Sequence, residues 1–554
     1  MGVSVQLLWA IAAAAAVCAV SRLVQVFVQK LWSTRQCKPV PRGNYRLKGF
    51  PFLGVLPELM CNLPCFHDWL VSKFEKHHTV TVPMLGTLEC YFTVDVENLK
   101  YILKTNFDNY IKGGLFHERF QILLGDGVFN TDGEMWKLQR KTVMPEFTSR
   151  NLRYFYTAAY TDVALRLSCL LDEIVQQGVA VDLQDLFLRM TLEAIGKVGF
   201  GVDIGCLPWQ LPLPENSFAR AFDSASETVS HRFVDPLWKL KRFFKVGYEA
   251  GLEANIEVID SFTFGVIAQR KLEIAAAREE QATGVALEEP KLDIITRFLK
   301  LAEDGKNGVD CKLIRDICLN FVIAGRDSTA VTLSWLVYSL IQKPDIAAKL
   351  HEELRSFEAK NQSLVNSEED SPVDDAAYAK VDKKIREFVK MLSSVNLKTE
   401  LPYLAAVISE TVRLYPAVPE IPKGIKDDDV LPDGTRVRKG MIITYSPYGM
   451  GRMMHIWGPD AKEFNPERWI HDGEFVMESE FKLTAFQAGF RMCMGRDSAY
   501  TQMKITAAIL YRFFEFQLVE GHSVEYKLMV ILYMANGLKV NIRRRDDSKS
   551  EKCR

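Results

Sequence analysis

The chain has 554 residues, of which 48% are hydrophobic and 25% charged, as in globular proteins large enough for more than one core. Its 69 Lys and Arg residues against 70 Asp and Glu residues give a net charge of -1, which excludes a strongly basic nucleic-acid-binding chain. The eleven cysteines are widely spaced and the nine histidines form no ligand-like cluster, so we expect a reducing compartment and no disulfide scaffold.

The N-terminus has the pattern of a membrane anchor. Residues Met1–Ser21 carry no charged side chain, and the apolar character continues to Val28, which is long enough to span a bilayer. Basic residues follow, and the first acidic residue is Glu58, so we expect the body of the protein on the cytoplasmic side. We predict an anchor at residues 1–28 and a basic, Pro-rich linker at 29–57. A cleaved signal peptide is the alternative, although the usual basic leading segment is missing.

The elements that follow predict a mainly α protein with a minor β-sheet subdomain. Thr79–Val94 is rich in β-formers and predicts a hairpin, and Val430–Tyr448 predicts a small sheet with a tight turn. Between them most segments have helical periodicity, notably Arg150–Gln176, Gly251–Glu280, Lys312–Gln342 and Pro344–Ser356. The polar stretch from about 356 to 400 predicts a surface insertion with short helices of its own, and residues 546–554 predict a charged tail.

One long apolar helix contains an acid followed by two hydroxyls, Asp327, Ser328 and Thr329. Such groups are costly inside a protein unless they have partners. Gly325 would allow a ligand to approach the backbone and would loosen the helix. An acid and an alcohol that face a metal could relay protons to bound dioxygen.

Two further patterns join charged groups on helices. Trp136 and Arg140 lie one turn apart, so that an indole N–H and a guanidinium could reach one acidic group of a ligand. Glu410 and Arg413 share a helical face between apolar residues, which indicates a buried pair that needs another partner. Arg468, in the run Pro466-Glu-Arg-Trp469, is our candidate for that partner.

The most informative stretch is Phe486-Gln-Ala-Gly-Phe-Arg-Met-Cys-Met-Gly495. Its single cysteine, Cys493, lacks the neighbours that a disulfide or a zinc site requires. It suits a thiolate held in a glycine-bounded turn and presented to one open position of a metal. Arg491 could pair with an acidic edge of the ligand, and Phe486 offers a ring to pack against it. An iron porphyrin meets these demands.

This spacing, Phe-x-x-Gly-x-Arg-x-Cys-x-Gly, resembles the haem-binding signature of the cytochrome P450 family of haem-thiolate monooxygenases. Residues 324–329 resemble the family's oxygen-activation motif, with Ser328 where a threonine is usual. The pairs Glu410/Arg413 and Trp136/Arg140 are similar to two further family elements. The resemblance implies the cytochrome P450 fold, with haem between the long oxygen-activation helix and the Cys loop, in a catalytic domain at 58–545.

The resemblance also implies the roles of the site residues. Haem b (iron protoporphyrin IX) is the expected cofactor, with O2 and NADPH as co-substrates. The expected metal ligand is Cys493, the haem-binding residues Trp136, Arg140, Phe486, Arg491 and Gly495, and the proton-relay residues Asp327, Ser328 and Thr329. Because the chain has no dinucleotide fingerprint, we expect electrons through a separate NADPH–cytochrome P450 reductase. That partner would dock near Lys137, Lys141 and Arg496.

Segments 125–133, 232–239 and 533–540 are similar to the plant long-chain fatty-acid ω-hydroxylase branch, and the 356–400 region to its sporopollenin-associated sub-branch. The expected function is ω-hydroxylation of long-chain fatty acids for sporopollenin or cutin-type precursors. The expected location is the endoplasmic reticulum membrane, with one span and a cytoplasmic catalytic domain. Phe490, where this branch usually has proline, and Met492 and Met494 depart from the pattern.

Three alternatives stay open at the level of sequence. The protein could bind haem only as a sensor or electron carrier, although these do not need a proton relay. It could be an oxygen-independent haem-thiolate isomerase or lyase, which typically lacks the acid–alcohol pair. It could also hydroxylate another lipid, such as an alkane or a terpenoid.

Overall fold

The computed structural model describes residues 44–84, 88–147, 155–282, 293–303, 308–365, 380–397 and 399–545. These residues belong to one unit of the chain, which begins at Asn44. The predicted anchor at 1–28, residues 29–43 of the predicted linker and the predicted tail at 546–554 lie outside the described residues. Among the helices of the described ranges, none has the length and apolar character needed to cross a bilayer.

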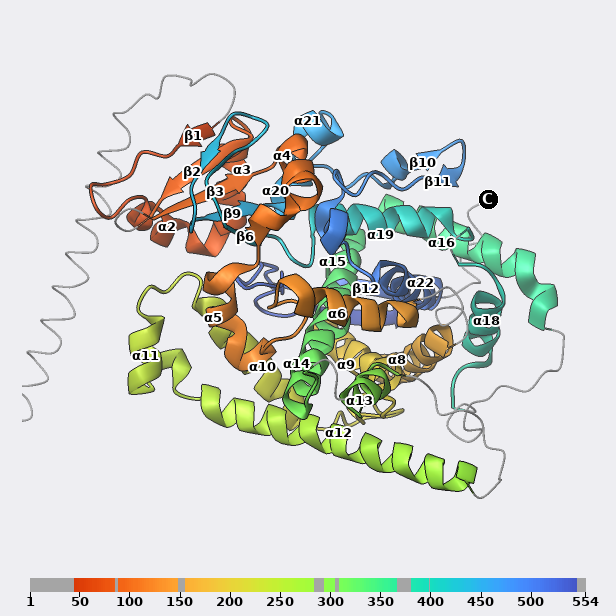
Figure 1. Cartoon of the computed structure of the whole chain (residues 1–554). Coiled ribbons are helices and arrows are strands. Elements are labelled where there is room, and N and C mark those ends of the chain that lie inside the picture. Colours follow the sequence, from red (N-terminus) through yellow and green to blue (C-terminus); the bar gives the residue numbers. More distant parts are fainter. Residues whose placement is uncertain are drawn as a thin grey trace, which may run out of the picture. The chain divides into compact units, whose positions relative to one another are not determined.

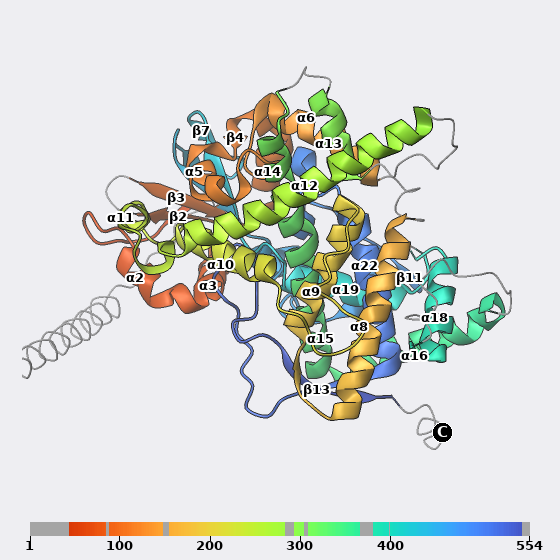
Figure 2. The ribbon, with the colours of Figure 1, turned by 90° about the horizontal axis from the view of Figure 1, so that it is seen from below.

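Helices dominate the described chain, as predicted (Figure 1). The longer ones are α5 (Gly113–Leu124), α6 (Gly133–Val143), α8 (Thr157–Gln177), α9 (Leu183–Ile195), α10 (Ser217–His231), α12 (Leu252–Ala282), α13 (Ile294–Glu303), α14 (Cys311–Val322), α15 (Ser328–Gln342), α16 (Pro344–Asn361), α18 (Lys383–Ser394), α19 (Pro402–Leu414) and α22 (Arg496–Phe513). The shorter ones are α2 (Leu56–Asn62), α3 (Phe66–Phe74), α4 (Val96–Lys100), α11 (Trp238–Phe244), α20 (Pro447–Met450) and α21 (Met454–Trp457). Figure 1 shows α12 along the lower edge of the helical body, and Figure 2, from below, shows it crossing in front of that body beside α10.

The strands form small sheets. The largest has the order β1-β2-β3-β9-β6-β4 and consists of β1 (Asn44–Arg46), β2 (Thr79–Pro83), β3 (Glu89–Thr93), β9 (Ile442–Tyr445), β6 (Ile421–Ile425) and β4 (Tyr110–Ile111). A second sheet joins β12 (Phe514–Leu518), β13 (Lys539–Arg544) and β5 (Val181–Asp182). Two two-stranded sheets pair β7 (Asp429–Val430) with β8 (Arg436–Val437), and β10 (Ile470–His471) with β11 (Glu474–Phe475).

The predicted hairpin at 79–94 is confirmed by the antiparallel pair β2–β3, in which Val80 lies opposite Phe92. The small sheet predicted within 430–448 is confirmed in part, because β7 and β8 pair around the turn but β9 leaves them to join β3 in parallel. This pairing brings the chain near residue 440 back onto the N-terminal sheet.

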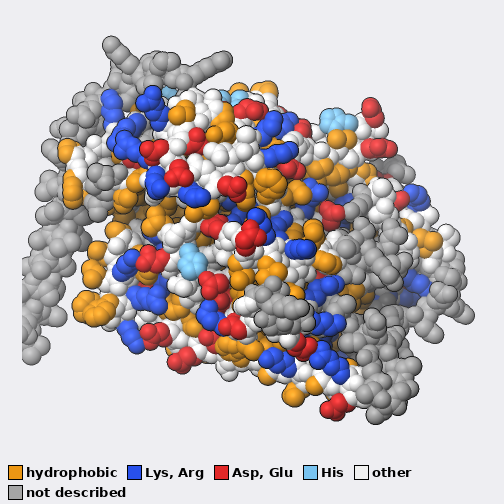
Figure 3. Space-filling view, viewed as in Figure 1, with side chains coloured by type: hydrophobic (Ala, Val, Ile, Leu, Met, Phe, Trp, Pro, Cys, Tyr) orange, Lys and Arg blue, Asp and Glu red, His pale blue; other side chains and the backbone are white. Residues whose placement is uncertain are grey.

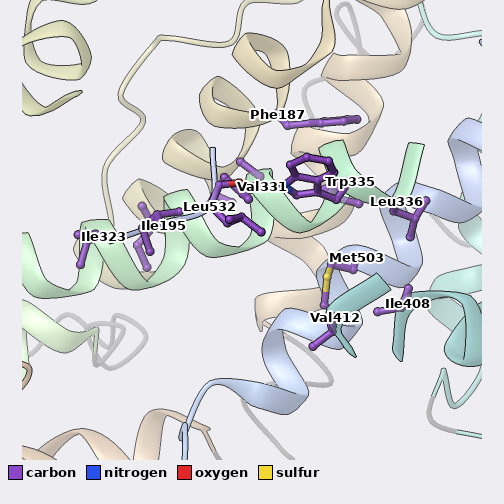
Figure 4. Close-up of a cluster of buried hydrophobic side chains, with 14 of the residues drawn as sticks. Phe187, Ile195, Ile323, Val331, Trp335, Leu336, Ile408, Val412, Met503 and Leu532 are labelled. Atoms are coloured by element: carbon purple, nitrogen blue, oxygen red, sulfur yellow. Dashed lines mark hydrogen bonds between the residues drawn. The ribbon is translucent and has the colours of Figure 1, made fainter. Parts of the chain in front are cut away.

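The core is built around α14 and α15, most of whose residues are buried, including the polar residues Arg315, Asp316 and Asn320 of α14. Figure 4 shows part of it, with Val331, Trp335 and Leu336 of α15 near Phe187 and Ile195 of α9, Ile408 and Val412 of α19, and Met503 of α22. The buried indole N–H of Trp335 donates to the carbonyl of Leu532 at 2.8 Å. The C-terminal segment is therefore tied to this central helix.

The long helices agree with the predicted periodicity, with two differences. The predicted helix Lys312–Gln342 is interrupted by a π-helical segment, Ile323–Asp327, between α14 and α15. The segment predicted as a surface insertion, 356–400, contributes to the core where it is described. Phe357 is buried on α16, which continues to Asn361, and α18 buries Ile385 and Phe388 against neighbouring helices.

The face of the molecule drawn in Figure 3 carries Lys and Arg side chains interspersed with Asp and Glu side chains. This mixture agrees with the net charge of -1. No large field of one sign develops on that face, as the composition predicts.

Candidate active site

The loop that carries Cys493 has a backbone that only certain residues tolerate. Gly489 has φ = 61°, and a Cβ there would lie 2.3 Å from the carbonyl oxygen of Leu103, so glycine is required. The N–H of Cys493 donates to the carbonyl of Phe486 at 2.8 Å, which closes the loop before α22 begins. A Cβ on Gly495 would lie 3.4 Å from the ring of Phe147, which is an ordinary van der Waals contact, so space alone does not require this second glycine.

The Cys493 thiol is enclosed by protein and yet accessible. Burial raises its pKa, whereas the N–H of Gly495 and the cations of Arg140 and Arg496 act in the opposite direction. Cys493 is nevertheless an exposed residue, which leaves part of its surface open to a ligand. A thiol with a raised pKa becomes a thiolate when a metal cation binds it, because the metal replaces the proton.

Helix α6 brings Trp136 and Arg140 to this loop, and their contact with a haem stays a prediction. The guanidinium of Arg140 donates to the carbonyl of Met492 at 2.9 Å. The guanidinium of Arg491 lies 4.5 Å from the centre of the Trp136 ring. Phe490 packs edge-on to Phe107 at 5.3 Å, so this atypical residue extends the same aromatic group.

Asp132 connects the 125–133 segment to the Cys loop. Its carboxylate forms an ion pair with Arg491 at 2.5 Å and accepts the backbone N–H groups of Lys112 and Gly113 at 3.0 and 3.1 Å. The glycines before it are required by close approach, because a Cβ on Gly125 would meet the Asp316 carboxylate at 2.0 Å. This segment therefore sets the position of Arg491.

The site also contains two buried lysines, which the sequence analysis did not identify. The antiparallel pairing of Ile111 with Gly424 sets Lys112 beside Lys423. Burial lowers the pKa of Lys112 to about 7 and that of Lys423 well below its usual value, and nearby positive charges, including Arg491, add to both shifts. The ammonium of Lys423 has no hydrogen-bond partner within the described residues.

The charges of these side chains show whether the site fits a haem. Lys112, Lys423, Arg491 and Arg140 converge, while Asp132 is the acidic group that raises the pKa values of Lys112, Lys423 and Arg491. Buried cations with too little counter-charge are unfavourable unless an anionic group joins them. The two propionates of a haem would supply that charge, so the residues fit the cofactor. A signal existed in the sequence, because Lys423 alternates with Ile421 and Ile425 on the buried face of β6.

The acid–alcohol segment lies in a long buried helix, as expected. A Cβ on Gly325 would lie 2.8 Å from Ile195 of α9, so a neighbouring helix makes a close approach at this glycine, and the approach of a ligand there stays a prediction. The expected loosening is present as the π-helical segment. Ser328 donates to the carbonyl of Ala324 at 2.6 Å, Asp327 is fully buried, and Thr329 is buried on α15.

The buried pair of Glu410 and Arg413 has Arg468 as its further partner, as the sequence predicts. Arg413 donates to both oxygens of Glu410 at 2.7 Å, and Arg468 donates to the same carboxylate at 3.1 Å. The indole of Trp469 adds a fourth donor at 3.0 Å. A fully buried ion pair with this many hydrogen bonds is an architectural element.

The remaining predicted positions are surface or packing residues. The ring of Phe486 lies 5.6 Å from that of Tyr500 on α22. Lys137 is exposed and paired with Glu134, Lys141 is exposed, and Arg496 is half-buried. Docking of a redox partner at these cations stays a prediction.

A thiol in a glycine-bounded loop, beside buried cations that have too little counter-charge, is the arrangement of a haem-thiolate protein. The chain belongs to the cytochrome P450 family, whose sequence model (Cytochrome P450) matches residues 46–541. Family membership implies haem, dioxygen and an electron donor, and defines the protein as a P450 monooxygenase with a redox partner and a lipid substrate.

Plant proteins of the same family are similar over nearly the whole chain. Cytochrome P450 704B1 of Arabidopsis thaliana is 47% identical over 500 residues, which cover 90% of this chain and 94% of that protein. Cytochrome P450 704C1 of Pinus taeda is 40% identical over 506 residues (90% and 93%). Cytochrome P450 86B1 of Arabidopsis thaliana is 37% identical over 501 residues (89% and 85%).

Proposed function

We propose that the protein hydroxylates the ω carbon of long-chain fatty acids and so supplies ω-hydroxy acids for polymers of the sporopollenin or cutin type. Segments 125–133, 232–239 and 533–540 support this substrate class through their similarity to the plant fatty-acid ω-hydroxylase branch. The observation that carries the proposal is an aromatic corner with an adjacent cation.

The aromatic corner consists of Phe116, Phe120 and Phe233. Their ring centres lie 4.8, 5.4 and 5.8 Å apart, and the guanidinium of Arg119 lies 5.3 Å from the ring of Phe233. An apolar wall next to a positive charge is complementary to an alkyl chain that ends in a carboxylate. A fatty acid held by its carboxylate at this corner would direct its methyl end inward.

A buried ion pair fixes the corner. Both oxygens of Glu249 accept from the guanidinium of Arg232 at 2.7 Å, and both side chains are fully buried. Arg232 also donates to the carbonyl of Arg119 at 2.9 Å, and Arg119 donates in return to the carbonyl of Arg232 at 3.0 Å. The 232–239 segment thereby holds Phe233 against α5.

The reaction consumes a fatty acid, O2, NADPH and a proton, and yields the ω-hydroxy acid, water and NADP+. When bound, haem b supplies the binding of dioxygen and the oxidising power for insertion into a C–H bond. Cys493 would ligate the iron, and Lys112, Lys423 and Arg491, with Arg140, would hold the propionates. Asp327, whose pKa burial raises to about 7, would hold and release protons at its carboxyl, and Ser328, the next residue in the chain, would contribute its hydroxyl to the relay.

We further propose that NADPH–cytochrome P450 reductase supplies the electrons and that the protein resides in the endoplasmic reticulum membrane, with one span and a cytoplasmic catalytic domain. The uncharged run Met1–Ser21 supports the span. Leu240, Phe243 and Phe244 on α11 are exposed among lysines and arginines, and apolar side chains gather there at the left edge of Figure 3. Such a surface suits contact with anionic lipid. Retention of the protein in microsomal membranes after alkaline extraction supports the span, and release into the supernatant contradicts it.

The test of substrate class uses microsomes that contain the protein and the reductase. Hexadecanoic and octadecanoic acids with NADPH should give ω-hydroxy acids, and hexadecane should react poorly. Arg119→Met should raise KM for the acids and leave hexadecane unaffected. The matched control is Glu118→Gln. Glu118 lies on the same helix as Arg119, and the substitution removes only its ion pair with Lys239. Equal turnover of the alkane and the acid, or no hydroxy acid from a correctly ligated enzyme, would contradict the proposal.

A further inference from the structure

A three-residue charge cluster connects the oxygen-activation helix with α10. Arg326, in the π-helical segment, is 2% exposed, and its guanidinium donates to both oxygens of Asp223 at 2.5 and 3.0 Å. It also donates to the carboxylate of Asp327 at 3.0 Å. One cation therefore lies between two acids.

The two acids differ in their access to water. The side chain of Asp223 is 47% exposed, whereas that of Asp327 is 1% exposed. In a region of low dielectric constant, two ionised acids around one cation leave an unbalanced negative charge. The cluster is neutral when Asp223 is ionised, Arg326 is charged and Asp327 holds a proton.

Other groups face this cluster. The hydroxyl of Tyr533 faces Asp327 closely enough to favour its ionised form. On the side of α9, Arg326 acts on the thiol of Cys206, which donates to the buried carboxylate of Glu193 at 3.3 Å. For Asp327 itself, burial raises the pKa, Arg326 lowers it and Asp223 raises it.

We propose that Asp223 is a positioning residue for the proton relay: by binding Arg326 from the exposed side, it leaves Asp327 free to take up and release a proton. This inference rests on the proposed role of Asp327 as proton donor. Without Asp223, the full charge of Arg326 acts on Asp327 and keeps it ionised. Without Arg326, Asp327 keeps its proton. The two substitutions therefore act in opposite directions, which a loss of packing would not produce.

Infrared difference spectroscopy of the holoenzyme with 13C-labelled aspartate measures the protonation of Asp327 without turnover. The carboxylic-acid band that Asp327→Asn removes should titrate near neutral pH. Asp223→Asn should move its midpoint to lower pH by on the order of one unit, and Arg326→Gln should move it higher. In turnover, the basic limb of the pH–rate profile should shift in the same directions, with more NADPH lost to hydrogen peroxide in Asp223→Asn.

Glu215→Gln is the matched control, because Glu215 forms an exposed ion pair with Arg220 near the start of α10. It should leave the midpoint and the peroxide yield unchanged. An unchanged midpoint in Asp223→Asn overturns this inference, and that variant should fold because its side chain is half-exposed. Unchanged product per NADPH in Asp327→Asn would instead overturn the proposed relay itself.

Discussion

The guanidinium of Arg140, on α6, donates to the main-chain carbonyl of Met492, the residue immediately before Cys493. This bond of 2.9 Å joins two segments more than three hundred residues apart in the sequence. It holds the loop from which the Cys493 thiol projects, so Arg140 has a role in loop geometry besides its proposed contact with a haem propionate.

Arg140→Leu should therefore weaken haem retention. A lost hydrogen bond from a charged donor costs about 1.5–3 kcal/mol, which corresponds to a roughly ten- to hundred-fold faster loss of haem. The rate of haem transfer to an acceptor apoprotein measures this. Lys137→Met, on the exposed side of the same helix, should behave as wild type, and equal rates for the two variants would contradict the role of Arg140.

The buried lysines predict the pH dependence of the haem-free protein. The pKa of Lys112 is about 7 in the folded chain and about 10.4 in an unfolded one. Between these values the unfolded chain binds more protons, so the free energy of unfolding should rise with pH and be smallest below about pH 7. Denaturant titrations at several pH values measure the slope.

Lys112→Met should reduce that slope, and bound haem should reduce it in the wild type, because propionates keep the lysine protonated. A slope that is the same with and without haem would mean that the propionates do not face Lys112.

The Glu410–Arg413 pair predicts a large loss of stability on partial removal. Glu410→Gln leaves Arg413 buried without its counter-charge, which should cost about 3–5 kcal/mol in the free energy of unfolding. Glu253→Gln, which breaks the exposed ion pair with Lys245, should cost at most about 1 kcal/mol. Similar costs for the two variants would contradict the architectural role.

We expect the side chain at position 328 to affect the fraction of NADPH electrons that forms product rather than hydrogen peroxide. The hydroxyl of Ser328 is held by the carbonyl of Ala324, and a threonine would hold the same bond with fewer rotamers. Ser328→Thr should raise the product formed per NADPH. Ser328→Ala should lower product formation by roughly the hundred-fold or more that loss of a proton donor typically costs. If the alanine variant matched wild type, the hydroxyl would have no part in the relay.

The parts of the site that the sequence predicts correctly are those with short, specific spacing. Cys493 and its glycines are recognisable because the backbone itself needs glycine at Gly489. The Glu410–Arg413 pair follows from helical periodicity, and its partner Arg468 from a short run before the Cys loop.

The parts that the sequence does not predict depend on contacts between distant segments. Lys112 and Lys423 become neighbours only through the pairing of β4 with β6. Asp223 of α10 forms an ion pair with Arg326, and although Arg326 lies within the 324–329 motif, Asp223 belongs to no recognisable spacing. The burial of the apolar side of α18 could not be predicted from composition, because polar residues dominate the segment that surrounds this helix.

The most direct test is the absorption spectrum of the reduced, carbon monoxide-bound form of Cys493→Ala. Our account predicts that the thiolate-ligated band is lost, while Cys311→Ala, at an exposed position, retains it in full. A thiolate band that persists in Cys493→Ala would show that another residue ligates the iron and would contradict the assignment of the site.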